Sequence, residues 1–563
     1  MTGERGRGLV LCGMLASLGA GGCVPPSEFD TNLLTRYQES VLARSPQRRK
    51  DRGLDLLRPV SAREVVPLKI SPDPADKVPV VELSLDQAVR LALLNSLDIR
   101  VVSFDSAMAR ETVISAEAEF DEVVFGSLSH AKAEERPGSG LMSSKSRDMP
   151  MEVGIRKRTT LGSELELKYS LTRSTDDSAF TMPNPRWDSR LELQLTQPLL
   201  RFGGKEFNLA TLEVARLDHK SSLASFREQV EAVVTAVETA YWSLLQGKRE
   251  LAIQQRLLRK TEETEQRVKG RGEIDATKVE RKQAEAAVKS RKAALLSVER
   301  AIADIQDQLV RLLADPRLGI LNTYRIKPVD SLVTAEVALD LKDQLALALK
   351  NVASLERARL AMQQADIRVK VAENAALPLL NLTASAGVQG MKGNPGPAVG
   401  DMFSLKFLSH SLGLLFEYPL GNRAARAELR RQKFGRLQAI VDYQNVADQV
   451  AVSVASAVRQ VKTAHAEIQA QRAAKLAFEA QLAALDAVEF RRALSPEFLQ
   501  VKLNAQELLA SVERAELKAT IDYNNALADL SRVTGTALQR KRVKLAAESA
   551  IQGRPLPRAP KPD

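Results

Sequence analysis

The 563-residue chain carries 81 Lys and Arg against 70 Asp and Glu, a net charge of +11, and 44% of its residues are hydrophobic although only 4% are aromatic. The prevalence of Ala and Leu over aromatic residues favours long helices over compact mixed cores. Because Lys and Arg alternate with Glu and Gln along the helical stretches, the basic excess indicates a solvated helical surface rather than a nucleic-acid site. Trp187 and Trp242 are the only tryptophans, which argues against a stacking surface for single strands.

The first residues have the pattern of an export signal. Two arginines precede an apolar stretch over residues 9–20, which is too short to span a bilayer, and small residues then lead into Cys23. This order resembles the bacterial lipoprotein signal, which implies cleavage after residue 22 and lipidation of Cys23. Cys12 would leave with the signal, so no disulfide is expected. An ordinary secretory signal is the alternative, because Ala20 stands where the lipoprotein pattern more often has Leu.

Residues 23–82 are rich in Pro, Arg and Asp and show no sustained period, so we interpret them as a lipid-anchored N-terminal linker. At most a short helix near residues 31–44 is expected there. Residues 539–563 form a basic, proline-rich tail that is predicted to be disordered.

The same unit occurs twice between these ends. The segment LALLNSL at residues 91–97 returns as LALKNVA at residues 347–353. Each copy leads into an Ala-rich helix, alternating segments, a Pro-Leu step at Pro198 or Pro419, and two long helical runs. A repeat of this length indicates a tandem duplication. The predicted division is a first repeat at 83–316, a linker at 317–338 and a second repeat at 339–538.

Helical periodicity is strong in both repeats. The predicted runs cover residues 276–314, ending at Asp315-Pro316, and 496–533, ending before Gly535. Apolar residues at helical spacing require burial against other helices, and small ones permit close packing. These positions are Val230, Val233, Val234, Val237, Ala240, Tyr241, Leu244 and Leu245 in the first repeat, and Ala447, Val450, Val454, Ala457 and Val461 in the second.

Strand-like segments lie between the helices and alternate apolar with polar residues. The apolar positions are Leu165, Leu167, Tyr169 and Leu171, then Leu191, Leu193 and Leu195, and in the second repeat Leu380, Leu382, Ala384, Ala386 and Val388, then Leu412, Leu414, Phe416 and Tyr418. Soluble sandwiches alternate in the same way. An exported chain without an apolar run of ~20 residues, but with strands of about 9 to 11, favours a membrane barrel. Two strands per repeat cannot close a barrel, so several chains must contribute.

The region 120–198 is longer than its counterpart 377–419. It contains an additional alternating stretch near residues 151–158 and a polar loop around Gly138. We interpret this excess as an extended extracellular hairpin rather than as extra wall strands.

The ordered set of segments resembles the TolC-type outer membrane efflux protein family over residues 83–538. The matching features are the helix opening with Asn95 and Asn351, the Ala-Leu-Pro of residues 376–378, and the Gln-Pro-Leu-Leu of residues 197–200 followed by two glycines. A Gly-Glu-Ile-Asp hairpin tip at residues 272–275 completes the set.

The resemblance implies a mixed α-helical barrel plus transmembrane β-barrel, trimeric, with four strands per protomer. It implies a passive outer-membrane channel-tunnel, lipid-anchored, with the helices in the periplasm, serving as exit duct of a tripartite efflux or type I secretion system. Its partners would be a periplasmic adaptor and an inner-membrane transporter. Strand-helix transitions would lie at Pro198, Pro378 and Pro419. The adaptor-docking tips would comprise Arg271, Gly272, Glu273, Ile274 and Asp275, and Arg492, Ala493, Leu494, Ser495 and Pro496.

The chain departs from the family pattern after both tips. Lys278 stands where the family often has Asp, and Val501 and Asn504 stand where some members place two Asp residues at a closed periplasmic mouth. An acidic, cation-binding mouth is therefore in doubt.

No enzyme chemistry is expected. The four histidines, His130, His219, His410 and His465, lie far apart without ligand spacing, and no glycine-rich phosphate loop follows a strand. We therefore predict no catalytic site, metal or cofactor. Two alternatives to the duct are a lipid-anchored periplasmic coiled-coil scaffold or adaptor without a pore, and a soluble oligomeric binding protein that uses the strands.

Overall fold

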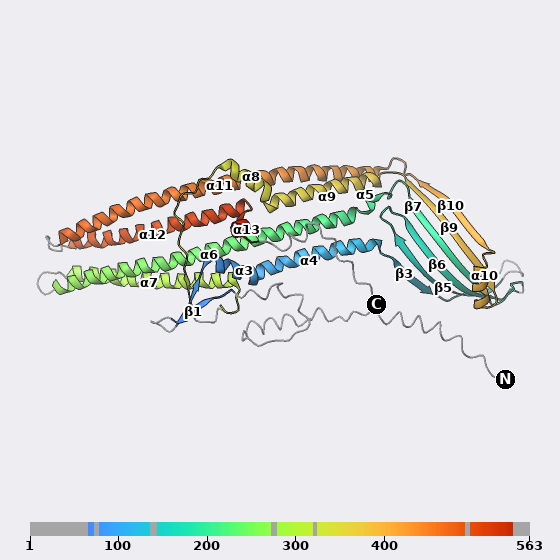
Figure 1. Ribbon diagram of the computed structural model, residues 1–563, viewed down its shortest axis with the longest axis horizontal. Helices are drawn as coiled ribbons and strands as arrows, with labels where there is room; N and C mark the ends of the chain where they lie inside the picture. Colours follow the sequence, from blue (N-terminus) through green and yellow to red (C-terminus); the bar gives the residue numbers. More distant parts are fainter. Residues whose placement is uncertain are drawn as a thin grey trace, which may run out of the picture.

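A computed structural model describes residues 66–72, 78–134, 143–178, 180–271, 278–318, 324–489 and 496–543. The molecule is elongated, with a large sheet at one end and long helices that run from the sheet to the other end (Figure 1). A small sheet and several short helices lie beside the long helices about midway along the molecule (Figure 1).

Two sets of helices occur in the same order. In each set a short helix is followed by a second helix that leads to the large sheet. After the strands, a long helix leads away from the sheet and a shorter helix runs back toward it. The first set is α3 (Leu85–Asn95), α4 (Leu97–Glu117), α6 (Ala210–Arg271) and α7 (Lys278–Leu313), and the second is α8 (Leu341–Asn351), α9 (Ala353–Ala375), α11 (Arg423–Glu489) and α12 (Pro496–Val533). At 62 and 67 residues, α6 and α11 extend over about 90 and 100 Å.

The helix boundaries follow local sequence signals. Ser84 begins α3 with a capping box in which its side chain accepts from the backbone of Gln87 and the Gln87 side chain accepts from the backbone of Ser84. The helical runs predicted for residues 276–314 and 496–533 are confirmed by α7 and α12. Gly535, at φ 65°, ends the second run in a left-handed conformation that favours glycine. Asn95 and Asn351 are the last residues of α3 and α8, and α4 and α9 begin two residues later.

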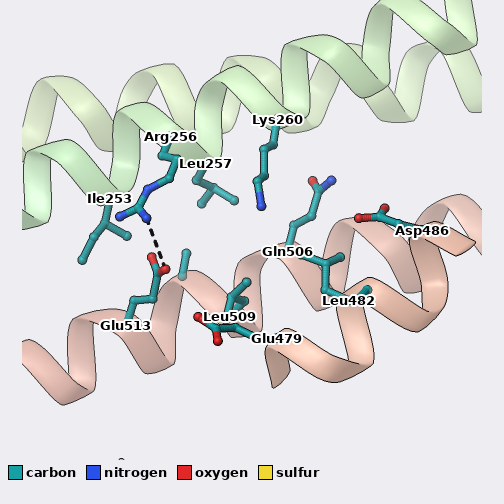
Figure 2. A pocket seen from close by; sticks show the side chains of 12 residues that line it. Ile253, Arg256, Leu257, Lys260, Glu479, Leu482, Asp486, Gln506, Leu509 and Glu513 are labelled. Carbon is teal, nitrogen blue, oxygen red and sulfur yellow. Dashed lines mark ion pairs between the residues drawn. The ribbon is translucent and has the colours of Figure 1, made fainter. Parts of the chain in front are cut away.

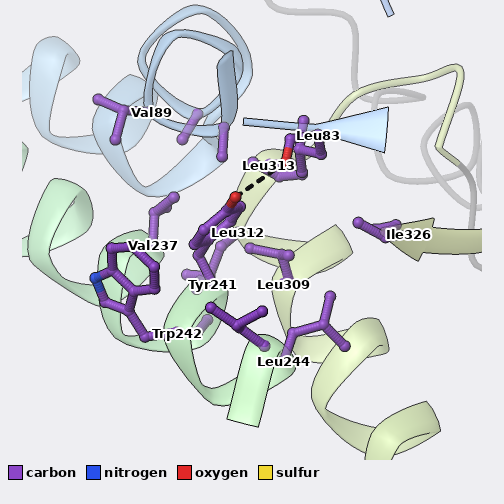
Figure 3. Close-up of a cluster of buried hydrophobic side chains, with 14 of the residues drawn as sticks. Leu83, Val89, Val237, Tyr241, Trp242, Leu244, Leu309, Leu312, Leu313 and Ile326 are labelled. Carbon is purple, nitrogen blue, oxygen red and sulfur yellow. Dashed lines mark hydrogen bonds between the residues drawn. The ribbon is translucent and has the colours of Figure 1, made fainter. Parts of the chain in front are cut away.

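Two hydrophobic clusters hold the helices together. The first joins α3, α6 and α7 to the small sheet, and its side chains include Leu83, Tyr241, Leu309 and Ile326 (Figure 3). The second joins α8, α11 and α12. The helical faces predicted from the sequence are confirmed, since all eight predicted positions from Val230 to Leu245 belong to the first cluster. Those from Val450 to Val461 belong to the second, with Ala447 partly buried against it.

The large sheet contains seven strands, all paired antiparallel, in the order β10-β9-β7-β6-β5-β3, with β4 also paired to β5. Since β3 pairs with residues 151–156 of β5 and β4 with residues 145–148, these two short strands occupy one side of β5 in succession. The strands are β3 (Val123–Leu128), β4 (Ala131–Glu134), β5 (Lys145–Arg158), β6 (Glu164–Asp176), β7 (Arg186–Pro198), β9 (Leu379–Lys392) and β10 (Leu408–Glu417).

The expectation of four strands per protomer, with an extended extracellular hairpin in the first repeat, is wrong. The sheet has six strand positions, and β5 and β6 lie inside it, with 13 paired residues between them and 11 between β6 and β7. The alternating stretch near residues 151–158 is part of β5. The prediction failed because alternation shows that a strand is two-faced and does not show which strand lies beside it.

The small sheet lies in segments that the sequence suggested were linkers. It consists of β1 (Lys69–Pro72), β2 (Pro79–Leu83) and β8 (Arg325–Pro328), with β2 antiparallel to β1 and parallel to β8. These strands have four or five residues and contain prolines, so they are too short to produce a clear alternating signal. Their positions overlap the expected linkers at 23–82 and 317–338.

Candidate functional site

The large sheet has one apolar face that runs across all six strand positions. Cross-strand pairing aligns Val124 with Ile155, Ile155 with Leu167, and Leu167 with Leu193, and the row continues to Ala386. Several of these side chains are exposed in the single chain, among them Ile155, Leu165, Leu167, Leu193, Leu408, Leu412, Leu414 and Phe416. An exposed apolar band of this extent on a sheet fits contact with lipid.

The opposite face of the same strands is polar and charged. In β5 and β6 it presents Glu152, Arg156, Glu166 and Lys168, and pairing places Arg156 opposite Glu166. Arg190 of β7 donates from Nη2 to Oε1 of Gln389 in β9 at 3.1 Å. The sheet therefore separates an apolar side from a water-compatible side, as the wall of an aqueous passage through a membrane requires.

A short helix covers the apolar face at the end of the sheet remote from the long helices. This helix, α10 (Pro395–Phe403), packs on β7 and β9 (Figure 1). Its Met402 is 1% exposed and contacts Ser189, which is fully buried. A Cβ atom on Gly390 would lie 2.3 Å from both the Ala398 carbonyl oxygen and the Met402 nitrogen, so the glycine permits this close approach.

The two outermost strand positions leave their outer edges unpaired among the described residues. One edge belongs to β10 and the other to β3 and β4. Unpaired backbone groups are tolerated in water but cost several kcal/mol each in lipid. An isolated chain with this sheet is thus incomplete as a membrane structure.

The three predicted strand-helix prolines lie between strands and helices. Pro198 is the last residue of β7, Pro378 lies between the end of α9 at Ala375 and the start of β9 at Leu379, and Pro419 lies between β10 and α11. Proline cannot donate to a strand ladder and its fixed φ suits a helix start, which gives a physical reason for Pro198 and Pro419. Pro378 follows the end of a helix, where proline is common because it cannot continue the helix.

The helix ends that flank the predicted docking tips lie farthest from the large sheet. There α6 ends at Arg271 and α7 begins at Lys278, while α11 ends at Glu489 and α12 begins at Pro496 (Figure 1). The intervening tip residues fall outside the described ranges, as does the predicted lipidation site Cys23. Those residues are Gly272, Glu273, Ile274 and Asp275 in the first tip and Arg492, Ala493, Leu494 and Ser495 in the second.

The helices near the tips are joined by a buried arginine that sequence reasoning missed. Arg291 of α7 is 8% exposed and donates from Nη1 to Oε1 of Gln506 at 3.3 Å and from Nη2 to the Leu503 carbonyl at 3.1 Å. Burial lowers the pKa of the Arg291 guanidinium, and Glu507 opposes that shift with Nε and Oε2 separated by 3.6 Å. Gln506 in turn donates to Oγ1 of Thr264 in α6 at 3.4 Å.

A second buried cation joins α12 to α11. The Lys502 side chain is 3% exposed and its Nζ lies 2.8 Å from Oδ1 of Asp486. A sequence signal for these residues exists, since the buried residues Leu499, Lys502, Leu503, Gln506, Leu509 and Ala510 follow the 3-4 spacing of a helical seam. A lysine and a glutamine at these positions indicate polar contacts between packed helices. Charged residues that only cover a solvated helix face would lie outside this pattern.

The exposed side of α12 contains the residues that replace the family's acidic pair. Val501 is 49% exposed, and Asn504 is exposed and accepts from Nε2 of Gln500 at 2.8 Å. Lys278, at the start of α7, is also exposed. Among the described residues, no three His, Cys, Asp or Glu side chains gather to hold a metal ion.

A cavity of about 300 Å³ lies between the two long hairpins, lined by α6 on one side and by α11 and α12 on the other (Figure 2). Arg256 and Lys260 of α6 face Glu479 and Glu513 across it. Arg256 Nη1 lies 3.6 Å from Glu513 Oε1. The hairpins therefore meet through complementary charge at this point.

Within the described ranges no helix combines the length and apolar character needed to cross a membrane. The long helical hairpins and the large sheet form an architecture that several solved outer-membrane channels also have. Similar solved structures share this fold. CusC matches with a TM-score of 0.59 and 16% identity over 80% of this chain and 92% of that one. VceC from Vibrio cholerae matches with 0.58 and 16% over 80% and 96%, and the open state of MtrE from Neisseria gonorrhoeae with 0.57 and 17% over 81% and 89%.

Sequence comparisons relate part of the chain to a known family. Residues 345–536 match the family model of outer membrane efflux proteins. The outer membrane efflux protein BepC of Brucella suis is 25% identical over 429 residues, which cover 75% of this chain and 88% of that protein. Over these residues the chain is similar to the outer membrane efflux proteins, the family that the sequence resemblance indicated.

Proposed function

We propose that the protein is the passive exit duct of a tripartite efflux or type I secretion system and works as a homotrimer. The observation that carries this proposal is the combination of a two-faced sheet, open at both edges, with helical columns that continue from its strands. Pairing of the open edges between copies would satisfy their backbone groups in lipid. The polar sheet face would then line a water-filled passage that continues between the helices.

The duct is tested by assembly and conductance of the full chain. In mild detergent, crosslinking should give trimers, and the purified trimer should produce discrete conductance steps in planar bilayers. A scaffold or soluble binding protein would need no detergent and would conduct nothing. A stable, monodisperse monomer in detergent, or a trimer that never conducts under any applied voltage, would contradict the proposed duct.

We assign the docking of a periplasmic adaptor to the two helical tips. The helix ends that flank the tips, at Arg271, Lys278, Glu489 and Pro496, lie opposite the large sheet, where an inner-membrane transporter would be met (Figure 1). Replacing Gly272 and Ser495 together by Arg should abolish export, because bulk and charge at a helical contact prevent close packing. Trimer assembly should be unchanged, since the tips lie far from the sheet edges. Crosslinking measures the trimer, and accumulation of substrate in cells measures export.

The matched control changes the same positions without bulk or charge, with Gly272→Ser and Ser495→Ala. Export should remain near normal in the control. If export is normal in the double Arg variant, the tips are ordinary turns and the docking assignment fails. Loss of the trimer in that variant would show instead that the tips contribute to assembly.

A further inference from the structure

The two halves of the chain contribute unequally to the large sheet. In the second half, β9 leads away from α9 and β10 returns to α11, giving two strand positions. In the first half, β3 and β4 lead away from α4 and β7 returns to α6, but the hairpin of β5 and β6 lies between them. The first half therefore supplies four positions. Because two strands, β5 and β6, lie between β3 and β7, neighbouring strands still run in opposite directions. A single strand at this place would make two neighbours parallel.

The turn of this hairpin is fixed against the start of the first long helix. Gly162, in the turn, has φ +90°, and a Cβ atom there would lie 2.6 Å from Nδ2 of Asn208. Asn208 is 5% exposed, accepts from Nη2 of Arg158 at 2.9 Å and donates to the carbonyls of Phe202 and Gly204 at 2.9 Å each. The turn is therefore packed beneath the connection from β7 to α6.

The other end of the hairpin is fixed by a carboxylate. Asp177, directly after β6, accepts at Oδ1 from the Ser143 hydroxyl at 2.8 Å, the Ser144 amide at 2.8 Å and the Lys145 amide at 3.0 Å. Hydrogen bonds from Ser144 and Ser143 hold the pKa of Asp177 well below its usual range. With both ends fixed and its apolar row continuous with those of β3 and β7, the hairpin has the features of a wall element.

Each free edge of the sheet has the direction needed to pair with the other edge in a second copy. β3 and β4 run away from the helices, whereas β10 runs toward them, so the two would meet antiparallel. We propose that these edges pair between copies and that each copy contributes six strand positions, so that the trimer encloses an 18-stranded barrel. This inference rests on the proposed trimeric duct and extends it.

The circumference of the helical tunnel supports this number. Next to the sheet each chain presents a row of four helices, α4, α6, α9 and α11, in which neighbours pack against one another. Twelve such helices at ~8–10 Å spacing have a circumference of about 100–120 Å. Eighteen strands spaced ~4.8 Å apart and tilted by ~40° give about 110 Å. Twelve strands at the same tilt give about 75 Å, which would require a steeply tilted barrel to meet the tunnel.

An 18-stranded barrel has room for an aqueous channel between its walls. The polar face of the hairpin would then add Glu152, Arg156, Glu166 and Lys168 to the lining of each third of the channel. The opening at the outer membrane would be about 1.5 times as wide as that of a 12-stranded barrel at equal tilt, because diameter grows roughly linearly with strand number. The outer end of the duct would thus admit bulkier polar cargo than a 12-stranded barrel would.

Cysteine pairs in the full-length protein distinguish the two barrels. Ser127→Cys in β3 is combined with Ser409→Cys, Ser411→Cys or Gly413→Cys on the polar face of β10, to sample the register between copies. At least one pair should form intermolecular disulfides and give a covalent trimer on a denaturing gel. The comparison pair is Ser127→Cys with Glu192→Cys of β7. In the observed sheet, β5 and β6 lie between β3 and β7, and Ser127 is in line with Arg190, two residues from Glu192. Three strand spacings of ~4.8 Å alone separate the two residues by about 14 Å, beyond the ~7 Å Cα separation that a disulfide permits.

Efficient intramolecular crosslinking of Ser127→Cys to Glu192→Cys would show β3 beside β7 and would overturn the inference, leaving the trimeric duct intact. Absence of any trimer would overturn the proposed duct itself. Electron microscopy of the wild-type trimer in nanodiscs gives an independent answer. We expect 18 strands in the barrel wall, and a wall of 12 strands would contradict the proposal. A variant lacking residues 135–176 should, where it folds, narrow the barrel about 1.5-fold.

Discussion

The hydroxyl of Tyr241 connects three separate parts of the chain at the middle of the helical region. Tyr241 is fully buried in α6, and its single hydroxyl proton faces two acceptors, Oδ2 of Asp330 at 2.6 Å and the Leu83 carbonyl at 3.1 Å. Figure 3 shows the contact with Leu83. The hydroxyl also accepts from the amides of Val329 and Asp330 at 3.1 and 3.2 Å. Burial raises the pKa of the Tyr241 hydroxyl, so it remains a neutral donor. The small sheet is thereby attached to the first long helix.

We expect Tyr241→Phe to lower the stability of the folded protein by roughly 1–3 kcal/mol, because the Leu83 carbonyl, two partly buried amides and the Asp330 carboxylate lose this partner. Tyr523→Phe is the matched control. Tyr523 is also fully buried, but its hydroxyl donates to the Ala335 carbonyl alone, at 2.7 Å. Thermal unfolding in detergent should show a clearly larger loss for Tyr241→Phe. Equal losses would mean that the connection to the small sheet adds no stability.

At the scale of single elements, the contact between α10 and the sheet depends on a close backbone approach at Gly390. Both atoms that a Cβ would meet there belong to the α10 backbone, so they cannot rotate away. The helix covers the buried Ser189 at the end of the sheet that is remote from the long helices. The contact between α10 and β9 therefore requires a residue without a Cβ atom at position 390.

Gly390→Ala should therefore displace α10 and destabilise the trimer by about 1–3 kcal/mol, the usual cost of overpacking. Gly400→Ala, on α10 itself, is the control, because a Cβ there would meet nothing within 4 Å. The temperature at which the trimer dissociates in detergent measures the effect. A Gly390→Ala protein as heat-stable as the Gly400→Ala protein would show that α10 does not pack on β9 in the membrane.

At the scale of the whole molecule, anchoring to the outer membrane has two candidate contributions, the lipid on Cys23 and the two-faced sheet. The sheet presents its apolar band across six strand positions, far more apolar surface than a lipid chain offers. An acylated cysteine and an apolar sheet would be redundant anchors. The sheet should accordingly determine where the protein resides.

Cys23→Ser should abolish incorporation of labelled palmitate while the protein still reaches the outer membrane. Cys12→Ser, whose cysteine lies in the predicted signal, should retain the label. Radiolabelling of cells followed by membrane fractionation measures both properties. Unchanged labelling of the Cys23→Ser protein would show that the export signal is not of the lipoprotein type, whereas loss of the protein from the outer membrane would show that the lipid is required for sorting.

Local patterns in the sequence were sufficient to predict the helices and strands as separate elements. The period of the apolar residues from Val230 to Leu245 identified a buried helical face, and alternation from Leu165 to Leu171 identified a two-faced strand. Both patterns arise from backbone geometry within one element, so they are visible without knowledge of its neighbours. The repeat of residues 91–97 and the ordered Pro-Leu steps were enough to indicate the family.

Only the tertiary structure decided which elements lie side by side. It placed β5 and β6 within the wall, paired β2 with β8 across more than 240 residues of chain, and buried Arg291 and Lys502 between helices. The pairing of strands depends on which edges are free once the chain is folded, and the burial of a cation depends on partners from other helices. Neither property is determined by residues near in sequence, because each arises from contacts between segments that the chain brings together only on folding.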